Sequence, residues 1–217
     1  MTREETYHAL LMEYASGCLD EAQALIVATH ISLSPSARKV VADYESMGGA
    51  MLKDCCAPVA MKSDALKCVM DKIDRLEKPQ SCTEKLRKKC GDKDMPTCLA
   101  SHMEKNTWKE EKTGVHSIHV KTTCCGYTAE LVKMAPDFSM DVQIHPTKHV
   151  LAVVLEGALS GGDKLFRRGD LAILEKGNTY PLRTDPQDGV ICFVVKPAQS
   201  RMRQWAGKVL SIFCPRN

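Results

Sequence analysis

The sequence predicts a two-domain α+β protein, with a small bundle of about four helices at the N-terminus and an all-β sandwich or barrel at the C-terminus. Apolar residues recur at helical spacing up to residue 76. Beyond Trp108, short segments rich in β-branched residues are separated by turns that contain glycine. A chain of 217 residues is long enough for two modules. We place them at 1–78 and 105–217, joined by a linker at 79–104.

Start and stop signals divide the first part into helices. The first predicted helix ends at Gly17, the residue type favoured just past a helix C-terminus. The second covers residues 19–32 and has acidic residues in its first turn, where they complement the helix dipole. The third starts at Ser34 and Pro35, a capping hydroxyl followed by proline at the first helical position, and runs to about Gly48.

The fourth predicted helix starts at Ser63 and carries an apolar stripe through Leu66, Val69, Met70 and Ile73. Such a stripe usually packs into a protein core. A four-helix unit this small buries only a thin core by itself, however. A partner surface would therefore also explain the stripe.

Charge and composition exclude several classes of partner. The net charge is +3, and the basic run at 85–89 has no interleaved aromatic platform, so we expect solvated linker and no direct DNA binding. The N-terminus has no apolar signal region, and no apolar run reaches the roughly 18 residues that span a bilayer. We expect a cytoplasmic protein without a membrane anchor.

The second part has the period of two that is typical of strands. Glycines at 157, 161–162, 169 and 177 are interpreted as turns between strands, and residues 199–210 as a closing helix. The predicted strands cover residues 116–120, 127–134, 150–156, 171–174 and 190–196.

Several segments resemble the ChrR-type anti-sigma factors. In the helical part these are ALLMEYASG at 9–17, ALIVATHISL at 24–33, GGAML at 48–52, APVA at 57–60 and ALKCVM at 65–70. In the second part, VVLEG at 153–157, RGDLA at 168–172 and ICFVV at 191–195 resemble the family's cupin domain. The likeness covers nearly the whole chain except the linker.

The resemblance implies a regulator without catalytic activity. Members of this family bind an extracytoplasmic-function sigma factor through the helical domain, block its access to core RNA polymerase, and release it under oxidative stress such as singlet oxygen. It also implies a cupin-like β-barrel at 105–217. A thin helical unit would gain apolar contacts by docking into a groove of such a partner. The sequence leaves the oligomeric state open.

The family's zinc site in the helical domain is only partly matched. Zinc needs about four nitrogen or sulfur ligands. His30 stands at one ligand position, but the two cysteine positions hold Ser34 and Ala37, and the first histidine position holds Glu5, with His8 one turn away. Cys18 and Cys55 are further potential ligands, although nothing in the sequence places them near His30. We expect no complete site of the family type and a metal-independent inhibitor.

The cupin metal motif is also substituted. Its two histidines, its glutamate and its distant histidine fall on Ile144, Pro146, Val150 and Tyr180. His145 and His149 are near the motif but out of register, and strand alternation points His145 away from the expected ligand face. This weakens the interpretation as a metal-dependent cupin enzyme.

Eleven cysteines suggest a second kind of chemistry. In a reducing compartment they would be thiols, and Cys90 beside two lysines has the positive surroundings that activate a thiol. We expect Cys68 and Cys192 to be buried as small apolar residues. The potential redox switches are Cys55–Cys56, Cys124–Cys125 and the evenly spaced Cys82, Cys90 and Cys98.

Two alternatives to the anti-sigma hypothesis remain at this stage. One is a small-molecule sensor or metal-dependent enzyme of the cupin type, whose helical part is a dimerisation arm. The other is a thiol sensor without a sigma-factor partner.

Overall fold

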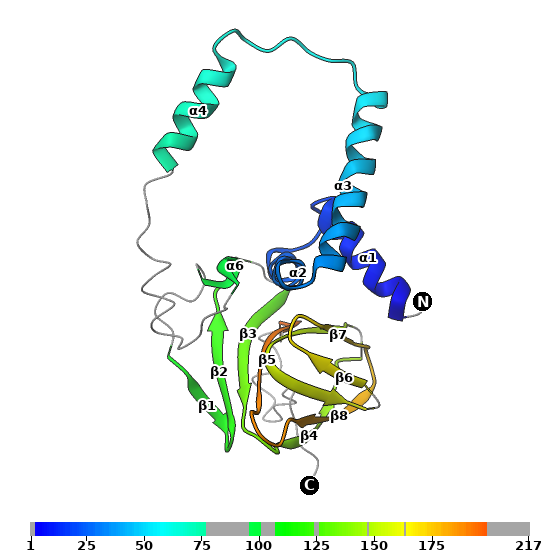
Figure 1. Cartoon of the computed structure of the whole chain (residues 1–217), viewed down its shortest axis with the longest axis vertical. Coiled ribbons are helices and arrows are strands. Elements are labelled where there is room, and N and C mark those ends of the chain that lie inside the picture. Colours follow the sequence, from blue (N-terminus) through cyan, green and yellow to red (C-terminus); the bar gives the residue numbers. More distant parts are fainter. Residues whose placement is uncertain are drawn as a thin grey trace.

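The computed structural model describes residues 3–76, 96–100, 107–123, 126–146, 148–162 and 164–198. Its helices are α1 (Arg3–Ala15), α2 (Glu21–Leu33), α3 (Pro35–Cys55), α4 (Ala65–Leu76) and the short α6 (Thr97–Ala100) (Figure 1). Its strands are β1 (Lys109–Lys112), β2 (Val115–Val120), β3 (Tyr127–Met134), β4 (Ser139–Gln143), β5 (Val150–Gly161), β6 (Lys164–Arg167), β7 (Leu171–Leu174), β8 (Thr179–Thr184) and β9 (Val190–Pro197). This architecture confirms the predicted α+β class.

Capping residues fix the helix boundaries much as the sequence predicts. Gly17 follows α1 with a φ of +70°, a left-handed conformation that glycine adopts without strain. Asp20 caps α2 by accepting a hydrogen bond from the backbone of Gln23 at 2.9 Å. Ser34 caps α3, and Pro35 is its first residue. Helix α3 ends at Cys55, about two turns beyond the predicted end at Gly48.

The strands form an antiparallel half-barrel in which β5 is shared by both walls. The strand order is β1-β2-β3-β9-β5-β8-β4, with β6 and β7 also paired to β5. The first half of β5 pairs with β7 and β9, and its second half pairs with β6 and β8. The change of wall occurs around Gly157, whose φ is +75°. A Cβ atom there would lie 2.1 Å from the carbonyl oxygen of Gly189, so only glycine fits.

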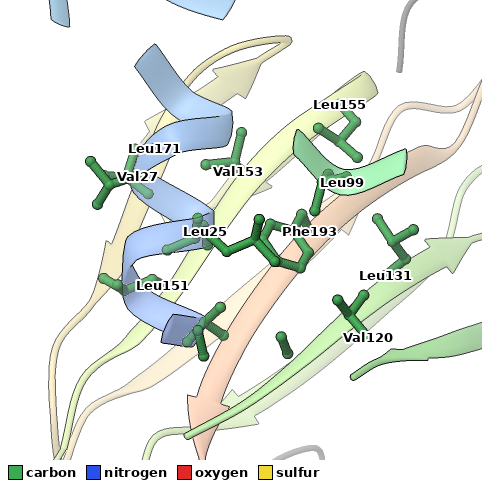
Figure 2. Packing of buried hydrophobic residues seen from close by; sticks show 14 of the residues in the cluster. Leu25, Val27, Leu99, Val120, Leu131, Leu151, Val153, Leu155, Leu171 and Phe193 are labelled. Atoms are coloured by element: carbon green, nitrogen blue, oxygen red, sulfur yellow. The ribbon is translucent and has the colours of Figure 1, made fainter. Parts of the chain in front are cut away.

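One wall of the barrel is buried on both faces. Alternate residues of β5 face opposite sides: Val150, Ala152 and Val154 belong to the barrel interior, whereas Leu151 and Val153 belong to a second core outside it. This outer core is shared with the helices. Figure 2 shows α2 lying across the wall, with Leu25 of α2 pointing toward Phe193 of β9.

Polar contacts reinforce the shared core at its rim. The backbone N–H and the hydroxyl of Thr123 both donate to the carboxylate of Glu21 at the start of α2. The guanidinium of Arg3 lies 5.1 Å from the ring centroid of Phe166 on β6. Helices α1–α3 and the barrel are therefore packed together as one unit.

Several expectations differ from the structure. Gly157 is not a turn between strands, because β5 continues through it to Gly161. Strands β1, β4, β6 and β8 lie outside the predicted strand segments. Helix α6 lies within the range predicted as linker, and its Leu99 is fully buried in the shared core. The rest of that range, apart from Pro96, and the helix predicted at 199–210 lie outside the described residues, as do residues 105 and 106.

Among the residues described, no helix combines the length and the apolar character needed to cross a bilayer.

Candidate functional site

A run of exposed apolar residues extends from the second half of α3 to α4. Val69 of α4 is 52% exposed, and Leu66 is 73% exposed. We call residues 47–73 the apolar arm. Its large exposed apolar side chains are Met47, Met51, Leu52, Val59, Met61, Leu66, Val69, Met70 and Ile73.

The apolar arm contributes nothing to either core of the described structure. In α4 the apolar residues recur three and four positions apart, so they share one face of the helix. Figure 1 shows α4 held away from the barrel and from α1 and α2. The first half of α3, by contrast, buries Ala37 and Val41. The stripe that the sequence left open between core and partner surface is exposed along its length, as expected for a helix that docks into a groove of another protein.

His30 lies where α1, α2 and the barrel meet, and it is 5% exposed. Its Nδ1 is 2.7 Å from the carbonyl oxygen of Gly169, and its Nε2 is 3.0 Å from the hydroxyl of Tyr7. A carbonyl only accepts, so Nδ1 carries the proton and Nε2 accepts from Tyr7. Burial lowers the pKa of His30, against smaller opposing effects of the Gly169 hydrogen bond and the Asp170 charge.

The residues around His30 do not fit the zinc site that the resemblance implies. Both ring nitrogens of His30 are engaged, the hydroxyl of Ser34 caps α3, and Ala37 offers only a methyl group. His8 is bonded instead to the hydroxyl of Tyr44 at 3.2 Å. Within the described ranges, no three histidine, cysteine, aspartate or glutamate side chains gather as a metal site would require.

The barrel positions that match the cupin metal motif are apolar or committed elsewhere. Ile144 and Val150 lie in the barrel interior, and Tyr180 is packed against the same core cluster. The hydroxyl of Tyr180 accepts a hydrogen bond from the backbone of Glu175 at 3.1 Å. These residues do not fit a metal centre of the cupin type.

The two out-of-register histidines flank the loop between β4 and β5. His145 follows β4, and its carbonyl accepts from the backbone of Gly177 at 3.1 Å. His149 precedes β5, and its Nδ1 is buried with no hydrogen-bond partner among the described residues. The structure does not bring His30 and these two histidines into a shared group of metal-ligating side chains.

The described cysteines differ widely in exposure. Cys192 is fully buried, and burial raises the pKa of its thiol to about 12, which makes it unreactive. Cys68 is exposed on α4, so the expectation that it is buried was wrong. Cys55 and Cys56 are exposed at the end of α3. The expected redox positions Cys82, Cys90, Cys124 and Cys125 lie outside the described residues, whereas Cys98 is half-buried with its sulfur 3.5 Å from the Thr29 hydroxyl.

Sequence reasoning did not find the junction between α2 and the barrel. One signal was present, because residues 150–155 form an uninterrupted apolar run, which is typical of a strand buried on both faces. Such a strand needs a covering layer, and α2 with α6 supplies it.

A helical unit with an exposed apolar arm, packed on a barrel in which apolar residues and a tyrosine occupy the cupin metal positions, places the chain in the helical-plus-cupin-like class, with a surface of the kind that binds other proteins. The comparisons agree. The chain is 27% identical, over 97% of its own length and 97% of the other, to the anti-sigma-E factor ChrR of Cereibacter sphaeroides. The structure matches the crystal structure of Rhodobacter sphaeroides SigE in complex with the anti-sigma ChrR with a TM-score of 0.66 and 26% identity, covering 87% of this chain and 96% of that chain.

The chain is thus a homologue of the ChrR-type anti-sigma factors over nearly its full length, as the resemblance predicted. The expectation of a regulator rather than an enzyme is confirmed by this homology. A weaker match, with a TM-score of 0.38 and 16% identity, is to an RmlC-like cupin protein of Ralstonia eutropha, covering 43% of this chain and 64% of that one. No protein-family profile matches the chain.

Proposed function

We propose that this protein is a cytoplasmic anti-sigma factor that captures an extracytoplasmic-function sigma factor through the apolar arm, as part of an oxidative-stress response. The observation that carries the proposal is the exposure of the arm. Its apolar side chains, such as Met51 at 65% exposed, face solvent over two helices and their connection. Burying them against a partner supplies the apolar contact area that the helical unit lacks.

The remainder of the chain supports the arm. Helices α1 and α2 hold the base of α3 at Val41, and α2 in turn packs on the barrel wall. We assign partner binding to residues 1–78 and the support to the barrel at 105–217. The homologous complex contains an anti-sigma factor bound to SigE, which makes a sigma factor the partner to test first.

The test compares one substitution on the two faces of α4. Val69→Asp places a charge on the apolar face, and we expect it to weaken binding of the sigma factor at least about ten-fold, because a charge buried without a partner is costly. Cys68→Asp, on the neighbouring residue, places the same charge on the polar face and should bind like the wild type. Both sites are exposed, so folding should be unaffected.

Affinity is measured by titrating the full chain into the sigma factor encoded nearest to its gene, with circular dichroism of each variant as the check on folding. Wild-type affinity for Val69→Asp would exclude the apolar face of α4 as the docking surface. Equal weakening by both variants would show a general charge effect and count against the proposal.

A further inference from the structure

A cavity of about 220 Å³ lies on the inner face of the half-barrel, where residues of β1, β2, β3 and β9 and of the edge strand β4 line it. Its apolar wall is formed by Val115, Val132, Met134 and Met140. The positions that match the cupin metal motif are not among the described residues that line it. The cavity is therefore distinct from the place where a cupin metal would bind.

Polar groups close one end of this cavity. The ammonium of Lys196 lies 2.6 Å from a carboxylate oxygen of Glu130, and both side chains are about one-fifth exposed. The hydroxyl of Ser117 donates to the carboxylate of Glu111 at 3.0 Å. Strand alternation sets Glu130 on the same inward face as Val132 and Met134.

These inward polar residues are poorly explained by stability alone. A partly buried ion pair contributes little net stability, and apolar residues in its place commonly pack as well or better. An apolar cavity with a few convergent polar groups is, on the other hand, the usual form of a small-molecule site. Its volume is below the roughly 300 to 1,000 Å³ of pockets for drug-sized compounds, so the ligand must be small.

The charges around the cavity select the class of ligand. Two carboxylates, of Glu111 and Glu130, and two ammonium groups, of Lys112 and Lys196, line it, so their formal charges cancel; the half-exposed Glu111 also lies 3.7 Å from the ammonium of Lys109. A charged head group would meet a like charge and lose its hydration. A neutral head group that both donates and accepts hydrogen bonds can instead donate to a carboxylate and accept from an ammonium group of the lining. The flexible thioethers of methionine adapt to an irregular aliphatic body.

We propose that this cavity binds a small uncharged amphiphile, with an alcohol or primary amide head beside Lys196 and Glu130 and a short aliphatic body along Met134 and Met140. Such a site lets the barrel respond to a small molecule without a bound metal. The proposal does not rest on the apolar arm, and its test involves no sigma factor.

The experiment titrates the full chain, labelled at its methionine methyl groups, with hexanamide. We expect saturable NMR shifts of Met134 and Met140, with a dissociation constant on the order of 1 mM, since so small a ligand offers limited binding energy. Met47 and Met51 on the apolar arm are internal controls and should not shift. Equal shifts at these exposed methionines, or no saturable shift in the barrel, would refute the site.

A charge-changing variant tests the ligand class. Wild type should bind hexanamide at least about five-fold more tightly than hexanoate or hexylammonium. Glu130→Gln leaves the cavity with excess positive charge, so it should come to prefer hexanoate. Glu110→Gln makes the same change in net charge on the exposed strand β1, next to the lining residue Glu111, but Glu110 itself is not a lining residue, so this variant should keep the wild-type order of affinities. The assignment would be overturned if Glu130→Gln kept the wild-type order of affinities. It would also be overturned if wild type bound hexanoate or hexylammonium as tightly as it binds hexanamide. The second comparison needs only the wild-type protein, so it holds even if Glu130→Gln does not fold.

Discussion

His30 on α2 and Gly169 in the turn before β7 are joined by a hydrogen bond of 2.7 Å across 139 residues of sequence. Gly169 has a φ of +88°, and a Cβ atom there would lie 3.3 Å from the Cβ of Leu33. Glycine thus lets the barrel turn approach the end of α2. At a position where the family resemblance places a zinc ligand, this chain has a direct contact between its helices and its barrel.

Removing the His30 side chain should destabilise the protein. His30→Ala removes the hydrogen-bond partner that the Gly169 carbonyl and the Tyr7 hydroxyl share, and we expect a loss of about 2–3 kcal/mol in the free energy of unfolding. His8→Ala is the matched control, because His8 makes one partly buried hydrogen bond to a hydroxyl, and it should cost less than about 1 kcal/mol. Urea denaturation followed by circular dichroism measures both. Equal losses in the two variants would mean that the hydrogen bonds of His30 contribute no more to the free energy of unfolding than the one of His8.

The same junction should make stability fall in mild acid. Burial lowers the folded-state pKa of His30 below its ordinary value of 6.5. Above pH 6.5 the side chain is neutral in both states and the stability is complete; below it the unfolded chain takes up a proton that the folded chain does not, until the folded pKa is passed. Asp170 nearby opposes this effect without reversing it, and Tyr7, whose own pKa is raised by burial, stays protonated.

We therefore expect the wild type to lose more stability than His30→Gln between about pH 7 and about pH 5, by up to about 1.4 kcal/mol per pH unit. Urea denaturation at each pH is the measurement. Parallel curves for the two proteins would show that His30 does not titrate differently in the folded and unfolded states.

The shared core predicts that helices and barrel unfold together. Ile26 of α2 is fully buried in that core, as is Phe193 of the barrel. Ile26→Ala should cost about 2–5 kcal/mol and destabilise β5 and β9 as well as α2. Native-state hydrogen exchange should give the same opening free energy for α2 and β5 amides in the wild type. Separate values, with Ile26→Ala lowering that of α2 alone, would indicate two independent units.

The sequence predicted the helices and the main strands because caps and periodicity are local signals. Gly17 and Ser34 act where expected, and the strand segments at 127–134 and 171–174 match β3 and β7. Gly157 was interpreted as a turn, although β5 continues through it from one wall of the half-barrel to the other. A glycine after an apolar run has the same sequence pattern in both cases. Only the non-local approach of Gly189 distinguishes the two cases.

The candidate site was predictable in part. The stripe on α4 was identified from its spacing, but its exposure was not, because an amphipathic face has the same sequence pattern in a core and on a partner surface. The ion pair between Glu130 and Lys196 was not predicted, because the two residues lie on strands far apart in the sequence. Pairing of β3 with β9 brings these strands together.

The poor fit of the ligand positions predicts independence from zinc. Full-length protein treated with EDTA should keep its melting temperature and its affinity for the sigma factor, because the described residues include no group of side chains that could hold a structural metal. Elemental analysis of protein purified without chelators should find well below one zinc per chain. Stoichiometric zinc, or a loss of sigma-factor binding on chelation that added zinc restores, would contradict this expectation.

The glycine pair in α3 predicts a change in partner affinity. Gly48 and Gly49 lie inside the helix, and a Cβ atom at either position would meet nothing within 4 Å. Each glycine costs a helix roughly 0.5–1 kcal/mol relative to alanine, so the base of the apolar arm is held only weakly in helical form. The double variant Gly48→Ala, Gly49→Ala should raise the helical signal and tighten binding of the sigma factor about five-fold or more. The reason is that the free arm is already more helical and loses less conformational entropy on binding. The reverse control, Ala50→Gly at the neighbouring exposed position, should weaken binding. Weaker binding by the double variant would show instead that the partner packs directly against the two glycines.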